Sequence, residues 1–404
     1  MISPGELLVK VYRVTVRAAA VAAAVLTLAG CGKETPVASP AVAQPMVVKI
    51  GFAGPLTGPR ANVGVDARNG AQFAVDRLNE SGEEIGNRKV TFELVVVDDE
   101  ATPSVAAAVA RKLVDAKVVA VVGHINSGAS IEASKVYSDA GIPQISPAST
   151  NPHYTKQGFK TTFRLVAADD LQAPVLVQFA LDTGTRKIAV VDDATAYGKV
   201  LADAFAESAR AAGAPIVARE SVDLKSPAPR AVLARIQAAR PDTVLFGGAD
   251  VVAAPLLQRM RAAGIKARFM GGDGIKTPDF IALAGNKSEG VVVSSPGVPG
   301  DSLPGGALFA PAYRSRFKTE IQQFAPMAYD AVFVIAEAMR KAGTAEPARV
   351  LPALGNVQLA GVSGGIAFDA RGDLRVAPVT LSSVNGGRWE TAQIIMTDPG
   401  AGKK

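Results

Sequence analysis

The stretch VVAVVGHINSGAS, residues 118–130, shows the unit from which this chain is built. It begins with a β-branched apolar run that is typical of a buried strand. The run ends at Gly123, and after a short loop a helical pattern starts at Ser127 and continues to about Asp139. A strand followed directly by a helix is the repeating unit of a parallel sheet with helices on its faces. The stretch therefore predicts an α/β fold.

The same unit recurs along the chain from residue 47 onward. We expect one series of strands at residues 47–53, 90–98, 118–123 and 144–146, and a second at 187–192, 215–222, 243–247, 269–271 and 290–294. A helix is expected between the first two strands of each series, at 69–82 and at 199–213. Because the order of elements repeats at an offset of about 125 to 140 residues, the sequence indicates an internal duplication.

Two Rossmann-like lobes with parallel central sheets follow from this duplication, since 404 residues are more than one core usually serves. In open α/β sheets, ligands bind outside the carboxyl ends of the strands. Glycine- or serine-rich loops follow strand after strand, at 54–64, 123–130, 146–152, 193–198, 247–251 and 271–275. Two lobes that face each other with such loops would form a cleft.

Two loops of the first half carry candidate ligand-binding residues. Ser127 stands at a helix start before Gly128 and Ala129, where uncovered N–H groups attract carboxylates. Ser149 and Thr150 follow a short strand between prolines, and their hydroxyls could bind both ends of a zwitterion. The alternatives are a capped helix without a ligand and a proline-rich turn whose serines bond to their own backbone.

The second half offers a complementary pair of candidates. The segment DDATAYG places Tyr197 at the mouth of a helix, and ARFMGGDGI places Asp273 among glycines. An acid in a glycine-rich loop after a strand is well placed to pair with a bound cation, although Asp-Gly is also an ordinary turn. The two halves together would supply carboxylate donors on one lobe and a negative partner on the other.

Seven segments give the sequence a family resemblance. They are GFAGPLTG (51–58), DDEATP (98–103), GHINS (123–127), ISPASTNP (145–152), DDATAYG (192–198), FMGGDG (269–274) and FDARGDL (368–374). Their order and spacing resemble those of the leucine/isoleucine/valine-binding proteins, type I periplasmic binding proteins that serve ABC importers. The resemblance covers about residues 46–390.

The resemblance implies roles for five residues. Ser127, Ser149 and Thr150 would hold the α-carboxylate and the α-amino group of an amino acid from the first lobe. Tyr197 would close on the ligand from the second lobe. Asp273 stands where the family usually has a glutamate that pairs with the ammonium group.

The resemblance also implies a hinge of three chain crossings, near Ala167, Pro296 and Val376. The N-terminal lobe would comprise residues 46–167 plus 297–376, and the C-terminal lobe 168–296 plus 377–398. Hinge closure around the ligand follows from this architecture.

Several residues depart from the family pattern around the ligand side chain. Ala249 and Val63 stand where relatives can carry aromatic residues, so we expect room for a branched-chain or other hydrophobic amino acid, including one larger than valine. Asp250 could contact a polar or cationic side chain, or could face solvent at a helix start, where an acid is favourable. Ala101 and Asn126 replace the cysteines that can bridge the first lobe.

The N-terminus predicts export and lipidation. A short, mainly apolar stretch, residues 14–27, begins after Lys10 and Arg13 and contains Arg17 near its start. It leads into Leu28-Ala29-Gly30-Cys31, which resembles a bacterial lipobox. We therefore expect a signal peptide at 1–30 and a tether at 31–45 whose Cys31 is acylated, which would make the protein a membrane-anchored periplasmic lipoprotein. The alternative is cleavage after the A-x-A sequence at 41–43, which would release a soluble protein.

Other functions are less well supported by the sequence. The two histidines, His124 and His153, lack partners at catalytic or metal-ligand spacing, so we expect no enzyme, metal or cofactor. A formal charge of +6 without a basic, aromatic patch argues against nucleic-acid binding. We expect a monomer that delivers an amino acid to ABC permease subunits. The alternative is a tethered sensor of amino acids or small amides.

Overall fold

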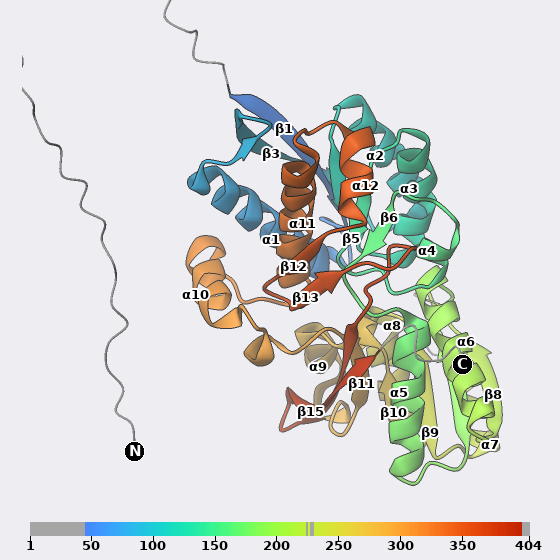
Figure 1. Cartoon of the computed structure of the whole chain (residues 1–404). Helices are drawn as coiled ribbons and strands as arrows, with labels where there is room; N and C mark the ends of the chain where they lie inside the picture. The colour runs from blue at the N-terminus through green and yellow to red at the C-terminus, as the bar shows by residue number, and fades with distance from the viewer. Residues whose placement is uncertain (1–44, 224, 227–229, 398–404) are drawn as a thin grey trace, which may run out of the picture. The chain divides into compact units, whose positions relative to one another are not determined.

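Two separate sheets organise the part of the chain that this computed structural model describes, residues 45–223, 225–226 and 230–397 (Figure 1). The strands of the first sheet are β1 Met46–Gly54, β2 Glu84–Ile85, β3 Arg88–Asp98, β4 Ala120–Gly123, β5 Gln144–Ser146 and β6 Thr162–Arg164. They lie in the order β2-β3-β1-β4-β5-β6, and every neighbouring pair except β2 with β3 is parallel. The predicted signal peptide and Cys31 lie outside the described residues.

The second sheet has seven strands. They are β7 Ile188–Asp192, β8 Ile216–Ser221, β9 Thr243–Gly247, β10 Arg268–Gly271, β11 Val292–Pro296, β14 Ala377–Asn385 and β15 Arg388–Thr397. Their order is β15-β14-β11-β10-β9-β7-β8, in which β14 and β15 are antiparallel additions at one edge. A small antiparallel pair, β12 Gln358–Ala360 with β13 Gly365–Ala367, lies apart from both sheets.

The two sheets repeat one strand order. Four adjacent strands of the first sheet lie in the spatial order β3, β1, β4, β5. Four adjacent strands of the second sheet lie in the corresponding order β8, β7, β9, β10. Each set therefore reads second strand, first strand, third strand, fourth strand along the chain. The predicted α/β fold with two Rossmann-like lobes is confirmed by this topology.

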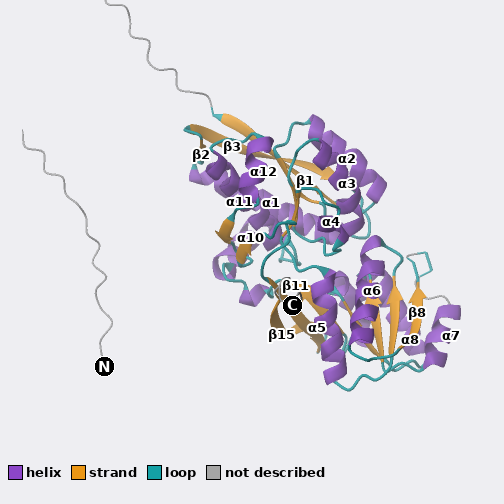
Figure 2. Ribbon diagram, turned by 45° about the vertical axis from the view of Figure 1, so that its right-hand side comes forward, coloured by secondary structure: helices purple, strands orange, loops and turns teal. Residues whose placement is uncertain are grey.

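Helices cover both faces of each sheet (Figure 2). On the first sheet, α1 Ala61–Ser81, α11 Ala325–Ala342 and α12 Pro347–Leu354 share one core, and α2 Pro103–Asp115 and α3 Ser127–Asp139 share another. On the second, α5 Asp169–Asp182 and α6 Ala196–Ala211 cover one face, and α7 Arg230–Ala239, α8 Asp250–Ala262 and α9 Pro278–Ala284 cover the other. The short elements are α4 His153–Lys156, α10 Gly306–Phe317 and the 3₁₀ turns η1 Asp273–Ile275, η2 Gly285–Lys287 and η3 Gly300–Ser302.

Helix α1 begins eight residues before the predicted start at residue 69. Two glycines interrupt its apolar pattern, and both are needed for close backbone contacts. A Cβ atom would lie 1.7 Å from the Pro55 carbonyl oxygen at Gly64, and 2.1 Å from that of Ala325 at Gly70. The glycines that weaken the helical pattern in the sequence are therefore the residues that let α1 approach its neighbours.

The chain passes between the two sheets three times. It leaves β6 for α5, returns from β11 to α11, and enters β14 after β13. The crossings expected near Ala167, Pro296 and Val376, and the lobe boundaries drawn from them, stay predictions; Pro296 is the last residue of β11. Among the described residues, no helix combines the length and the apolar character that a bilayer crossing requires.

Candidate ligand-binding site

The first lobe presents the start of α3 at the carboxyl end of β4. The helix starts at Ser127, and its N-cap is Asn126. The Ser127 hydroxyl is buried and accepts a hydrogen bond from the Asn151 N–H at 3.3 Å. This bond ties the loop after β5 to the first turn of α3, whose N–H groups have no partners inside the helix.

His124 supports this loop from within the protein. It is fully buried, with Nδ1 2.6 Å from Asp99 Oδ2 and Nε2 3.1 Å from the Tyr137 hydroxyl. Its carbonyl oxygen accepts from the Ser146 hydroxyl at 2.7 Å. Because both ring nitrogens are engaged, His124 joins the loop after β4 to the end of β3 and to α3 rather than offering an acid or base to a ligand.

The neighbouring Ser149 and Thr150 differ in the use of their hydroxyl groups. Ser149 Oγ lies 2.6 Å from Ser130 Oγ and donates to the Ile125 carbonyl oxygen at 3.2 Å, so its side chain is engaged within the loop. The Thr150 side chain is also buried, yet its hydroxyl has no hydrogen-bond partner among the described residues. The geometry therefore leaves Thr150, rather than Ser149, with a free polar group.

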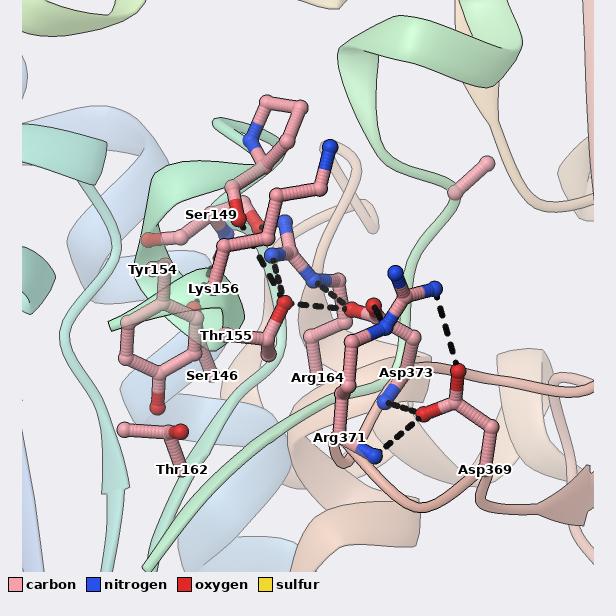
Figure 3. A network of polar contacts seen from close by, with 12 residues as sticks. Ser146, Ser149, Tyr154, Thr155, Lys156, Thr162, Arg164, Asp369, Arg371 and Asp373 are labelled. Carbon is pink, nitrogen blue, oxygen red and sulfur yellow. Dashed lines mark hydrogen bonds and ion pairs between the residues drawn. The ribbon is translucent and has the colours of Figure 1, made fainter. Parts of the chain in front are cut away.

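A buried arginine fixes the backbone of the same loop (Figure 3). Arg164 Nη1 donates to the carbonyl oxygens of Ser149 at 2.9 Å and Asn151 at 3.1 Å. Its Nη2 donates to Thr155 Oγ1 at 2.7 Å, and its Nε lies 2.6 Å from Asp373 Oδ1. Every nitrogen of the guanidinium thus has a partner, and the loop that carries Thr150 is held in one position.

Asp169 is a residue that the sequence reasoning missed. It is the first residue of α5, and its N–H donates to the Thr150 carbonyl oxygen at 2.8 Å. Its side chain is completely buried, and neither carboxylate oxygen has a hydrogen-bond partner among the described residues. Burial raises the pKa of Asp169 well above its usual range, and the charge of Asp273 raises it further. The signal available in the sequence was an acidic pair, Asp169-Asp170, directly after an expected crossing.

Asp273 and Tyr197 meet in the second lobe. The Tyr197 hydroxyl donates to Asp273 Oδ1 at 3.0 Å and accepts from the Gly274 N–H at 3.1 Å. A Cβ atom at Gly272 would lie 2.7 Å from the Tyr197 hydroxyl, and one at Gly274 would lie 2.8 Å from the ring. The two glycines around Asp273 are therefore required for the tyrosine to reach the carboxylate.

The buried carboxylates of Asp169 and Asp273 form no ion pair in the described part of the chain. Burial raises the pKa of Asp273 to about 6, against the opposing effects of the Tyr197 hydrogen bond, Arg60 and Gln172. No ion pair joins Asp169 or Asp273 to a basic side chain in the described part of the chain. The carbonyl oxygen of the Gln172 side chain is likewise buried without a partner. This region is rich in hydrogen-bond acceptors and needs a ligand that brings donors and positive charge.

Asp250 has a structural partner in the other lobe. Its Oδ1 lies 2.9 Å from Arg60 Nη1, and its Oδ2 accepts from the Thr277 hydroxyl at 2.6 Å. The residue is only 1% exposed, so the alternative in which it faces solvent is wrong. With both oxygens engaged, Asp250 joins the start of α8 to the loop before α1.

Two residues, Ala249 and Val63, were expected beside the ligand side chain. In the structure Ala249 makes a hydrogen bond through its backbone, and Val63 lies in the core. The Ala249 N–H donates to Asp193 Oδ2 at 2.9 Å, immediately before α8. Val63 is fully buried in the apolar cluster of the first lobe. A pocket widened by these small residues stays a prediction.

Two further contacts join the loops of the two lobes. Asn151 Nδ2 donates to the Ala196 carbonyl oxygen at 2.8 Å, and Asn62 Nδ2 donates to Asp279 Oδ2 at 2.8 Å. Together with the Arg60–Asp250 pair they hold the loops of the first lobe against those of the second. Among the described residues, no group of three or more histidine, cysteine or acidic side chains is arranged to hold a metal ion.

Comparisons with known proteins agree with this architecture. The sequence pattern of the family described as periplasmic binding protein matches residues 47–388. The chain belongs to this family. It is 33% identical over 329 residues, 81% of this chain and 87% of the relative, to the leucine-, isoleucine-, valine-, threonine- and alanine-binding protein of Pseudomonas aeruginosa.

Solved structures of the family have the same fold. The leucine-binding protein LivK from Thermotoga maritima is 25% identical, with a TM-score of 0.80 over 87% of this chain and 99% of that one. The branched-chain amino acid transporter substrate-binding protein LivJ from Streptococcus pneumoniae, solved with isoleucine, is 28% identical, with a TM-score of 0.78 over 87% and 100%.

Proposed function

We propose that this protein is an extracytoplasmic substrate-binding protein that holds an amino acid between its lobes and delivers it to an ABC importer. The observation that carries the proposal is the pair of buried carboxylates, Asp169 and Asp273, which form no ion pair with any described basic side chain. Leaving such groups unpaired is unfavourable, and a bound ammonium group would relieve the cost. Membership of the periplasmic binding protein family supports the same function.

Each end of the amino acid has a matching group in the site. The α-ammonium would lie between Asp169, Asp273 and the free hydroxyl of Thr150. The α-carboxylate would accept from the N–H groups in the first turn of α3, beside Ser127. Tyr197 would close over the ligand while it orients Asp273. In this arrangement Ser149 acts through the backbone of its loop, since its hydroxyl is already bonded.

The ligand side chain would be that of a branched-chain or other hydrophobic amino acid. The proposal uses the small size of Ala249 and Val63 and the relationship to proteins named for leucine, isoleucine and valine. Asp250 is assigned to the ion pair with Arg60 instead of a contact with the ligand.

Ligand binding would be coupled to a hinge motion. The N-terminal lobe, residues 46–167 plus 297–376, and the C-terminal lobe, 168–296 plus 377–398, would separate to admit the amino acid. They would then close with the contacts of Arg60, Asn62 and Asn151. A monomer with both lobes closed would present one surface to the permease subunits.

Attachment to the membrane would come from acylated Cys31, with residues 31–45 as a tether. Replacing Cys31 with serine removes the thiol that acylation needs, so Cys31→Ser should move the protein out of the membrane fraction or leave it unprocessed. Mass spectrometry of the mature wild-type N-terminus tests the same point. A mature chain that begins at Gln44 would contradict the lipid anchor.

The experiment that tests ligand binding is a thermal-shift screen of the twenty amino acids, followed by calorimetric titration. A ligand at a hundredfold excess over Kd stabilises the folded state by about 2.7 kcal/mol. We expect the best ligands to include a hydrophobic amino acid heavier than valine. Binding should be lost in Asp169→Asn but kept in the matched control Asp170→Asn, whose side chain is exposed and paired with Lys156. A screen in which none of the twenty amino acids responds would refute the proposal.

A further inference from the structure

A cavity separate from the residues of the amino-acid site lies at the end of β11 and includes Lys276, three residues after Asp273. Its volume is about 580 Å³. Strands β11, β14 and β15 of the second sheet line one side, and the start of α11 with the segment before α10 lines the other. Much of the wall is apolar, including Val298, Leu303, Ile321, Met327 and Trp389. None of the residues assigned above to the amino acid lines this cavity.

Lys276 is the single basic residue of the cavity wall. Its ammonium donates to the Ser295 hydroxyl at 3.1 Å, and no carboxylate in the described residues forms an ion pair with it. Burial lowers the pKa of Lys276 to about 8, opposed by the charge of Asp273. A half-buried ammonium with one hydroxyl partner has unused donors, so this wall favours an anionic group.

Two further donors in the same wall are unused. The amide nitrogen of Gln323 and the hydroxyl of Ser382 are buried without hydrogen-bond partners in the described structure. Ser382 is 1% exposed, and it lies on a strand paired with β11, which carries Ser295. Buried polar groups are normally bonded. An ammonium, an amide and a hydroxyl in one wall match the two oxygens of a carboxylate.

The acidic residues of the cavity do not neutralise Lys276. Asp301 and Glu390 are both exposed, and Glu390 accepts a hydrogen bond from Asn385 at 2.9 Å. Asp273 lies one 3₁₀ turn before Lys276 and faces Tyr197. The ammonium group of Lys276 therefore faces the cavity, whereas the carboxylate of Asp273 faces the amino-acid site.

We infer that this cavity is a second binding site, which takes a carboxylate on an apolar body with Lys276 as its cation. The apolar residues would contact the body of the ligand, and Lys276, Gln323 and Ser382 would donate to its carboxylate. Such a carboxylate can come from a separate organic acid or from the side chain of an acidic amino acid. Both sources present the same chemistry to Lys276.

Calorimetric titration of the full chain with 4-methylpentanoate and with glutamate tests the inference. The first compound has a carboxylate and an apolar body without an ammonium group, and the second carries its own side-chain carboxylate. We expect at least one of them to bind, and Lys276→Met to weaken that binding at least tenfold. Lys276→Arg should retain most of it, because the charge remains. The matched control Lys287→Met, at an exposed lysine, should have no effect.

The amino-acid site provides the second arm of the test. Asp169→Asn should leave 4-methylpentanoate binding within threefold, whereas it should abolish glutamate binding, because glutamate also needs its ammonium partner. Leucine binding should change less than threefold in Lys276→Met, which separates this inference from the proposed function. The inference is overturned if neither acid binds the wild-type protein, or if the affinity for the acids is unchanged in Lys276→Met.

Discussion

Arg164 and Asp169 lie five residues apart, at the end of β6 and the start of α5, and both are completely buried. Every nitrogen of the Arg164 guanidinium has a hydrogen-bond partner. Neither oxygen of the Asp169 carboxylate has one among the described residues. A buried charge whose partners belong to the chain contributes to the structure, whereas one without partners depends on a molecule from outside. Arg164 therefore supports the ligand-binding site, whereas Asp169 belongs to the site itself.

Removing the satisfied charge should cost the most stability. In Arg164→Met, the Asp373 carboxylate and the carbonyl oxygens of Ser149 and Asn151 lose their donor. We expect the free energy of unfolding to fall by about 3 to 5 kcal/mol, as for other broken buried pairs. Urea denaturation measures this change. The control is Arg371→Met, whose ion pairs are partly exposed and should contribute less than about 1 kcal/mol. Equal losses of unfolding free energy in the two variants would contradict the special structural role of Arg164.

Removing a buried charge that forms no ion pair should instead affect ligand binding. Asp273→Ala leaves the bound ammonium with less compensation, at a cost of about 3 to 5 kcal/mol. Since 1.4 kcal/mol is tenfold in Kd, binding should weaken by roughly two to three and a half orders of magnitude. Asp273→Glu should be tolerated better. Isothermal titration of both variants decides the point, and an alanine variant within threefold of wild type, with its fold intact, would exclude Asp273 from the site.

The buried charge of Asp273 should also destabilise the ligand-free protein. The pKa of Asp273 is about 6 in the folded state and near 3.8 when unfolded, so the unfolded state binds fewer protons between these values. Ionisation of Asp273 therefore lowers stability by up to about 3 kcal/mol at pH 7. Asp273→Asn should recover up to this amount at pH 7 and nothing below about pH 4. Urea unfolding of wild type and variant across this pH range measures the difference in stability. A variant that is less stable than wild type at pH 7 would contradict the prediction.

The smallest expected effect is on the pH dependence of affinity. Asp273 must be ionised to attract an ammonium group, and its pKa in the free protein is about 6. Affinity for a neutral amino acid should therefore be constant from pH 7 to 8 and should fall by up to tenfold per pH unit below about pH 6. Titrations at pH 7 and pH 5 measure this change. Affinity that is equal at the two values would show that Asp273 does not contact the ammonium.

The sequence predicted the repeated fold more completely than the site. Runs such as VVAVV identify buried strands because apolar character and β-branching are local properties. The start of helix α1 was missed because Gly64 stood in a predicted glycine-rich loop, and its place in a helix is explained only by the close contact with Pro55. The antiparallel strands β14 and β15 were also not predicted as strands.

The residues of the site depend on contacts between distant parts of the chain. Tyr197 and Asp273 could be singled out because glycines and a helix start accompany them, and they are hydrogen-bonded to each other. Asp169 looked like an ordinary acid at a helix start, which is favourable in any helix. Its distinction from exposed Asp170 is burial, a property that arises only when the lobes meet. The pairing of Asp250 with Arg60 was missed for the same reason.

That ion pair has a consequence for the kinetics of the proposed transport cycle. Arg60 and Asp250 belong to different lobes, and their contact does not involve a ligand. The lobes must break it before they separate, so it adds to the barrier for release and lengthens the residence time of a bound molecule. It also favours closure of the empty protein, and the apparent affinity falls with the fraction of molecules that are open to entry. A stronger Arg60–Asp250 ion pair would thus slow both the release of a bound ligand and the entry of a new one.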